Sequence, residues 1–223
     1  IPKPGEISLA HNGVLFLDEL PEFHKNTLEV LRGPLEDGIV TLSRVNATLT
    51  YPCRFMFVAS MNPCPCGYFG SKQKECTCSP QSITKYIGKI SGPLLDRIDI
   101  QVEVTPVKYQ SLGDGSSGET SRDIKVRVNK ARKIQQNRYV GESIYANAQL
   151  TPRLVEKYCS INSESKQILE TAFHKLGLSA RAYGRILKVA RTIADLEDAK
   201  NIQSAHIAEA IQYRSLDKKY WNN

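Results

Sequence analysis

An acidic pair directly follows a short apolar run near the start of the chain. Residues 14–17 read Val-Leu-Phe-Leu, and Asp18 and Glu19 come next. Such a run is typical of a strand buried on both faces of a parallel sheet. A carboxylate at the strand end can orient Mg²⁺ and its waters, and a second can polarise an attacking water, which is the Walker B arrangement. The alternative is a solvated strand end with no chemistry.

A second apolar run, residues 55–60, leads into Asn62. We expect it to be the neighbouring buried strand, which would place Asn62 beside the acidic pair. There its amide could hold an attacking water or a γ-phosphate. An isolated Asn after a strand is otherwise an ordinary turn residue. The two strands together predict a catalytic edge of the sheet.

Arg97 precedes an alternating stretch, residues 98–104, that we predict to be a half-exposed edge strand. An arginine at this place could reach the nucleotide of a neighbouring subunit and neutralise charge that develops on a γ-phosphate. The alternative is a local ion pair with Asp96 or Asp99.

Four of the six cysteines fall within fifteen residues, at Cys64, Cys66, Cys76 and Cys78. Two Cys-x-Cys pairs could place four thiolates around a structural Zn²⁺, although this spacing is tighter than the usual two-residue gap. Free or oxidised thiols are the alternative. Cys53 and Cys159 are expected to be buried apolar residues.

The elements around these residues predict two domains. Residues 39–42 and 47–51 indicate a β-hairpin with Arg44 at its tip, and a helix interrupted near Gly33-Pro34 precedes it. We predict an α/β core over residues 1–112, a Gly/Ser-rich linker over 113–122 and a helical lid domain over 123–223. One predicted lid helix begins after Ser179 and carries Arg181 and Arg185, either of which could contact phosphate.

The composition fits a globular chain of one large or two modest domains, with 223 residues and 41% hydrophobic residues. No run approaches the roughly 18 apolar residues of a membrane span, and the start is unlike a signal peptide, so we expect a cytoplasmic protein. The net charge of +7 suits a nucleic-acid partner, but an ordinary basic surface explains it equally well.

Taken together, the motifs resemble the Mg-chelatase-like branch of the AAA+ ATPases, and within it the ComM/YifB competence-protein group. The resemblance spans nearly the whole chain. It rests on five motifs in order: residues 13–20 (Gly-Val-Leu-Phe-Leu-Asp-Glu-Leu), 34–38 (Pro-Leu-Glu-Asp-Gly), 61–67 (Met-Asn-Pro-Cys-Pro-Cys-Gly), 91–99, and 179–182 (Ser-Ala-Arg-Ala).

The resemblance implies a partial P-loop NTPase core followed by an all-α lid, with ATP and Mg²⁺ as cofactors and a ring, usually hexameric, as the assembly. It implies that Asp18 and Glu19 form Walker B, Asn62 is sensor 1 and Arg97 is the arginine finger. Arg181 would be the sensor 2 arginine, with Arg185 as its competitor. The hairpin around Arg44 would be the pre-sensor-1 hairpin, which contacts DNA in related motors.

Three functions follow as hypotheses: a DNA-remodelling or branch-migration motor, the ATPase subunit of a metal chelatase or a protein-remodelling ATPase, and a zinc-bearing interaction module. The cysteine segment favours the first over the chelatase. One departure is clear: no Gly-x-x-x-x-Gly-Lys-[Ser/Thr] sequence occurs, and Gly67 to Lys72 has the wrong spacing. We therefore expect a fragment whose phosphate-binding loop lies upstream, and which alone neither binds nor hydrolyses ATP well.

Overall fold

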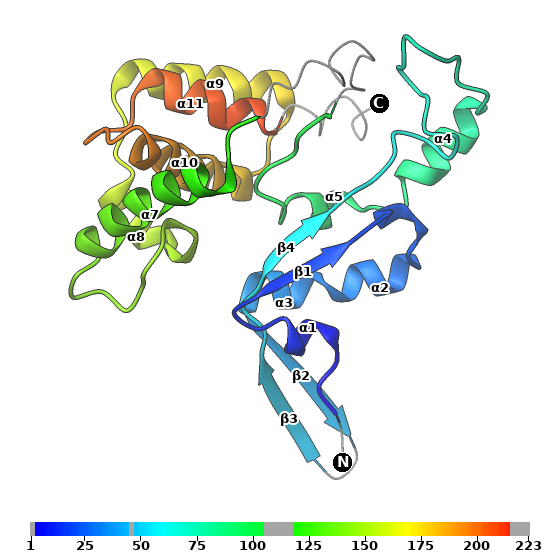
Figure 1. Ribbon diagram of the computed structural model, residues 1–223, viewed down its shortest axis with the longest axis horizontal. Helices are drawn as coiled ribbons and strands as arrows, with labels where there is room; N and C mark the ends of the chain where they lie inside the picture. The colour runs from blue at the N-terminus through cyan, green and yellow to red at the C-terminus, as the bar shows by residue number, and fades with distance from the viewer. Residues whose placement is uncertain (1–2, 45–46, 105–117, 215–223) are drawn as a thin grey trace. The chain divides into compact units, whose positions relative to one another are not determined.

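The computed structural model describes residues 3–44, 47–104 and 118–214 (Figure 1). The chain divides into two compact units, one of residues 1–98 with 220–223 and one of residues 99–219. Each unit is described by itself. Residues 113–117 of the expected linker lie outside the described residues.

The first unit is built on two parallel strands, β1 (Val14–Leu17) and β4 (Met56–Ala59). They pair in register from Val14 opposite Met56 to Leu17 opposite Ala59. Leu15 and Leu17 face the apolar core, whereas Val14 is 58% exposed. The prediction of these strands is confirmed, but burial of β1 on both faces is wrong, since one face is open in the described residues.

Helices and a hairpin connect the two strands. Figure 1 shows the antiparallel pair of β2 (Ile39–Arg44) and β3 (Ala47–Pro52) extending away from β1 and β4, as predicted. The interruption expected near Gly33-Pro34 is observed at Leu31, between two short helices, α2 (Lys25–Val30) and α3 (Arg32–Asp37), and Gly33 and Pro34 themselves lie in the first turn of α3. Gly38 ends α3 with a φ of 68°, a left-handed conformation that suits glycine. The remaining elements of this unit are α1 (Glu6–Leu9), η1 (Leu20–Glu22), α4 (Pro80–Ile87) and α5 (Gly92–Leu95).

The strand predicted over residues 98–104 is absent, although the structure describes all seven residues. Ile100, Val102 and Val104 are 51%, 64% and 87% exposed. Alternation alone specifies a strand only where a pairing partner and an apolar surface receive it. Among the described residues no strand pairs with this segment, and the side chains at 100, 102 and 104 are largely exposed, so the edge-strand prediction is wrong.

The second unit is helical, as predicted for a lid. Its core is formed by the apolar faces of α9 and α10 with residues from α8 and α11. The predicted start at Ser179 is confirmed, because its hydroxyl accepts a hydrogen bond from the backbone N–H of Ala182 at 3.2 Å. Ile124 and Val128 are 40% and 42% exposed. The elements are α7 (Ser121–Arg138), η2 (Asn147–Gln149), α8 (Pro152–Tyr158), α9 (Ser163–Leu176), α10 (Ala180–Leu196) and α11 (Ser204–Gln212). Among the described residues, no helix combines the length and apolar character needed to cross a bilayer.

A buried ionic network joins α7, η2 and α10. The Asp195 side chain is 0% exposed and accepts hydrogen bonds from Arg138, from Arg191 at 3.2 Å and from Asn147 at 2.9 Å. The hydrogen bond to Asp195 raises the pKa of Arg138. Arg191 also donates to the carbonyl groups of Ala199 and Lys200, at 2.6 and 3.0 Å. The network fixes how these segments pack.

Asp195→Ala should lower the free energy of unfolding by about 3–5 kcal/mol, because two buried guanidinium groups would lose their counter-charge. Lys130→Ala is the control, since the Lys130–Asp198 pair is 62% and 58% exposed, and its loss should cost less than about 1 kcal/mol. Urea denaturation followed by circular dichroism measures both. Equal losses would contradict the structural role of Asp195.

Candidate active site and cysteine cluster

The register of β1 and β4 brings their carboxyl ends together. Asp18 follows β1 and Ser60 follows β4, and the Ser60 hydroxyl donates a hydrogen bond to Asp18 Oδ1. The backbone of Ser60 is held by two more bonds: its N–H donates to the Leu17 carbonyl at 3.0 Å, and its carbonyl accepts from Leu20 at 2.8 Å. The acidic pair is therefore tied to the end of the neighbouring strand. Ser60 was not singled out in the sequence, although its place at the end of an apolar run was the available signal.

Glu19 adopts a conformation that few residues other than glycine take. Its φ and ψ are 50° and 51°, and such left-handed residues concentrate at functional sites. Its backbone N–H donates to Asp18 Oδ1 at 3.0 Å. Both carboxylates are exposed. The turn thus presents two oxygen-ligand side chains to solvent at the strand end, a donor set that suits Mg²⁺ with its waters.

Asn62 lies two residues beyond Ser60 and is exposed. The side-chain amide of Asn62 lies against the start of the cysteine loop. A Cβ atom placed on Gly67 would be 3.9 Å from Asn62 Oδ1. Tyr86 of α4 is 6% exposed. Burial, then the charges of Glu22 and Glu19, raise the pKa of Tyr86.

The four clustered cysteines converge. Cys64 Sγ is 3.4 Å from Cys66 Sγ and 3.7 Å from Cys76 Sγ, and Cys66 and Cys76 are 3.6 Å apart. With Cys78, all four sulfur atoms lie within 4.8 Å of one another. Sulfurs on a tetrahedral Zn²⁺ with bonds near 2.3 Å are about 3.8 Å apart. The cluster therefore has the donors and spacing of a four-cysteine zinc site.

The thiols in this cluster have divergent acidities. Backbone N–H groups of Tyr68 and Thr77 lower the pKa of Cys66 to about 5. The backbone of Cys78 favours the thiolate of Cys76 too, but burial and the neighbouring thiols outweigh it and raise the pKa of Cys76 to about 12. Crowded thiolates repel one another, and a divalent cation would relieve this repulsion.

The Arg97 side chain is only 8% exposed and has acceptors in its own unit. It pairs with Glu36, and it donates to the carbonyl groups of Arg32 at 3.0 Å and Pro93 at 2.7 Å. These contacts span up to 65 sequence positions. Arg97 thus connects α3 to the segment after α5. Its ion pair is with Glu36 of α3.

The other predicted arginines lie at three separate places. Arg181 is exposed in the first turn of α10, whereas Arg185 pairs with Asp99 at 2.5 Å. Arg44 ends β2 opposite Ala47, and its side chain is outside the described residues.

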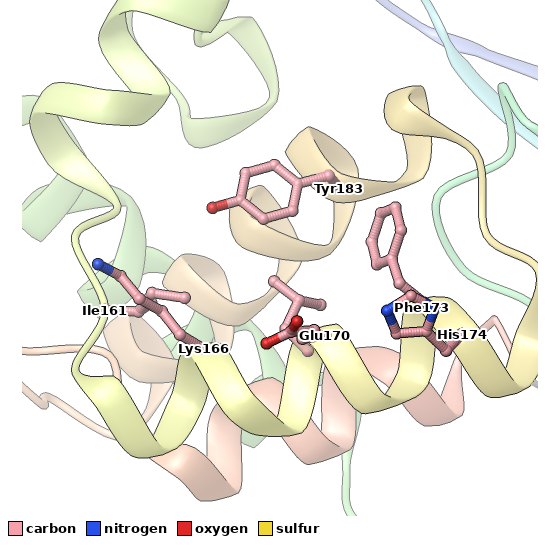
Figure 2. A pocket seen from close by; sticks show the side chains of 7 residues that line it. Ile161, Lys166, Glu170, Phe173, His174 and Tyr183 are labelled. Atoms are coloured by element: carbon pink, nitrogen blue, oxygen red, sulfur yellow. The ribbon is translucent and has the colours of Figure 1, made fainter.

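A pocket in the helical unit contains none of the predicted site residues. Figure 2 shows Tyr183 of α10 facing Lys166 and Glu170 of α9 across it. Its volume is about 310 Å³, and the Phe173 ring contacts the Tyr183 ring edge-on, with centroids 6.0 Å apart.

The fold defines a class: part of a P-loop-type α/β core followed by an all-α domain. The family profile described as "Magnesium chelatase, subunit ChlI" matches residues 1–112, and that of the "ChlI C-terminal" region matches residues 118–214. The chain belongs to this Mg-chelatase-like family.

Named relatives refine this assignment. The chain is 49% identical to "Competence protein ComM" of Haemophilus influenzae over 217 residues, 97% of this chain and 42% of that protein. It is 45% identical to "Uncharacterized protein YifB" of Escherichia coli over 98% of this chain and 42% of that protein. It is 27% identical to "Magnesium-chelatase subunit ChlI" of Anabaena variabilis over 49% of this chain and 26% of that protein. The chain thus spans 42% of the length of ComM and YifB.

Arg97→Ala should lower the free energy of unfolding by about 2–3 kcal/mol, because the carbonyl groups of Arg32 and Pro93 would lose the donor of their charge-assisted hydrogen bonds. Arg127→Ala is the control: its pair with Glu119 is 52% and 42% exposed and should contribute less than about 1 kcal/mol. Urea denaturation of both variants tests this. A loss as small as that of the control would show that Arg97 has no structural role in its own subunit.

Proposed function

We propose that this chain is the Walker B, sensor 1 and lid portion of an AAA+ ATPase of the ComM type, and that ATP is hydrolysed at the edge formed by β1 and β4. The observation that carries the proposal is the in-register parallel pairing, which joins Asp18 to Ser60 and places Asn62 beyond the same edge. A solvated strand end without function would not need a left-handed Glu19 with both carboxylates exposed.

Each residue has one task in this proposal. Bound ATP with Mg²⁺ supplies the phosphoanhydride and the compensating charge. Asp18, which accepts a hydrogen bond from the Ser60 hydroxyl, would orient Mg²⁺ and its waters, and Glu19 would accept a proton from the attacking water. Asn62 holds that water or the γ-phosphate through its amide.

The phosphate-binding loop must come from elsewhere in the parent protein. ComM and YifB are more than twice as long as the region they share with this chain, at 42% coverage, and the 223 residues hold no Gly-x-x-x-x-Gly-Lys-[Ser/Thr] sequence. We propose that the parent supplies this loop, and that the chain alone does not turn over ATP.

A ring of subunits, most simply a hexamer, would supply the remaining positive charges at the nucleotide. In this proposal Arg97 exchanges its contacts with Glu36 for the nucleotide of a neighbouring subunit. Arg181 is favoured as the sensor 2 residue because it is exposed at the start of α10, whereas Arg185 holds Asp99.

We propose DNA as the polymer on which the motor acts. The relative from Haemophilus influenzae is named a competence protein, the net charge is +7, and the β2–β3 hairpin carries Arg44 at its end. Hydroxyl pairs on one hairpin face, Thr41 with Thr50 and Ser43 with Thr48, add exposed donors of the kind that contact phosphates.

The full-length parent should hydrolyse ATP, and Glu19→Gln should lower kcat at least about 100-fold, because the base is lost while the shape is kept. Phosphate release measures this. Glu22→Gln, a nearby exposed carboxylate of η1, is the matched control and should keep wild-type turnover. Full activity of Glu19→Gln would contradict the assignment.

DNA should stimulate this turnover, and Arg44→Ala should reduce the stimulation with little change in basal rate, since a phosphate contact would be lost. Lys3→Ala is the control for a basic side chain outside the hairpin. Turnover indifferent to single- and double-stranded DNA would favour the chelatase-type or protein-remodelling alternative.

We propose that the cysteine cluster binds one structural Zn²⁺, because all four ligand positions are thiols and no open coordination site remains for catalysis. Protein purified under reducing conditions should contain about one zinc per chain by mass spectrometry of the metal. Cys76→Ser should lose most of it, whereas Cys53→Ala, at a buried cysteine outside the cluster, should retain it. Zinc at background level in the wild type would refute the site.

A further inference from the structure

The cations of α7 fall into two groups. Three of them pair with carboxylates of the helical unit: Arg127 with Glu119 at 2.9 Å, Lys130 with Asp198 at 2.8 Å, and Arg138 with Asp195. Four others are exposed, and within the described part of the chain no ion pair includes them: Arg122, Lys125, Arg132 and Lys133. The helix thus carries four positive charges that no carboxylate of the described residues neutralises.

These four charges lie on one face of the helix. An α-helix turns by about 100° per residue, so six positions of α7 fall within about 100° of one another around its axis. All six are exposed: Arg122, Lys125, Asn129, Arg132, Lys133 and Gln136. The single carboxylate of α7, Asp123, lies outside this face and accepts a hydrogen bond from the Thr120 hydroxyl at 2.5 Å. We name this face the basic stripe.

The opposite face of α7 fixes the direction of the basic stripe. Ala131 and Gln135 are only 3% and 4% exposed. The Gln135 side-chain oxygen accepts a hydrogen bond from the backbone N–H of Asn147 at 3.2 Å, and Arg138 binds the buried Asp195. These contacts set the rotation of the helix about its axis, so the basic stripe is directed to solvent.

The charge of the basic stripe fits an anionic partner. Like charges on neighbouring turns of a helix repel one another, as Arg122 and Lys125 do at a spacing of three residues. Anions bound along the stripe would relieve this repulsion. The net charge of the whole chain is +7, and composition could not show that four unneutralised charges gather on one helix.

The length and chemistry of the basic stripe favour duplex DNA. From Arg122 to Gln136 the helix rises by about 21 Å, which is the length of about six base pairs at 3.4 Å each. Arginine, lysine, asparagine and glutamine are side chains that contact phosphates. Because α7 contains no aromatic residue, it lacks the stacking surfaces on which proteins hold single strands.

We propose that the basic stripe of α7 binds the phosphate backbone of double-stranded DNA without reading its sequence. The inference rests on the proposal that DNA is the polymer on which the motor acts. It adds a second contact surface, which belongs to the helical unit and not to the β2–β3 hairpin. The helical unit would then hold the duplex in addition to covering the nucleotide.

The test compares double variants of the full-length parent. Lys125→Gln with Arg132→Gln removes two charges of the basic stripe. The matched control removes two paired charges of the same helix, by Arg127→Gln with Lys130→Gln. A third variant, Lys125→Arg with Arg132→Lys, keeps the charge of the stripe.

Fluorescence anisotropy with a labelled duplex of about 30 base pairs, between about 50 and 200 mM salt, gives the Kd and its salt dependence. A non-hydrolysable ATP analogue with Mg²⁺ is present throughout. The same measurement is made with single-stranded DNA, with anionic phospholipid vesicles and with Arg44→Ala, and a melting temperature is recorded for each protein.

The stripe variant should bind the duplex at least about tenfold more weakly at about 0.1 M salt. The plot of log K against log salt should have a slope that is shallower by at least about 2, one for each lost phosphate contact. The control and the charge-keeping variant should match the wild type in both quantities. All melting temperatures should agree, because Lys125 and Arg132 are exposed.

Wild-type affinity in the stripe variant would overturn the inference, and so would an equal loss in the control, which would show a dependence on net charge alone. A loss confined to single-stranded DNA or to the vesicles would overturn it too. No DNA binding by the wild type would overturn the proposed DNA motor as well. Loss of binding in Arg44→Ala alone would leave that proposal standing and overturn only the basic stripe.

Discussion

The parallel pairing of β1 with β4 is the constraint on which the rest of the first unit depends. Hydrogen bonds in register from Val14 to Leu17 set where each strand ends. If the pairing slipped by one residue, Ser60 would no longer meet Asp18, and the side chains of one strand would exchange faces. The apolar core under Leu15 and Leu17 prevents this slip, because these residues cannot face solvent without losing their burial.

A polar loop and a helix extend this edge without a large core of their own. The segment from Cys64 to Cys78 has no strand or helix among its described residues. A metal held by four thiolates would supply the stability that apolar burial cannot supply here. Strand pairing thus places the carboxylates, and the Asn62 amide lies where the cysteine loop begins.

Patterns within a few residues of one another were predicted well from the sequence. The β2–β3 hairpin, a helix break near Gly33-Pro34 and the cap at Ser179 each depend on local propensity, and all are observed, with the break itself at Leu31. Contacts set by the fold were not predicted. Glu36 meets Arg97 from 61 positions away, and no sequence period indicates such a pair.

We propose that the nucleotide binds at the β1–β4 edge. A structure of the full-length parent with Mg²⁺ and a non-hydrolysable ATP analogue tests it most directly. We expect Mg²⁺ and its waters to lie within hydrogen-bonding reach of Asp18. We also expect the Asn62 amide to be directed at the γ-phosphate or the attacking water. A nucleotide bound elsewhere, with Asp18 and Asn62 facing only solvent, would contradict it.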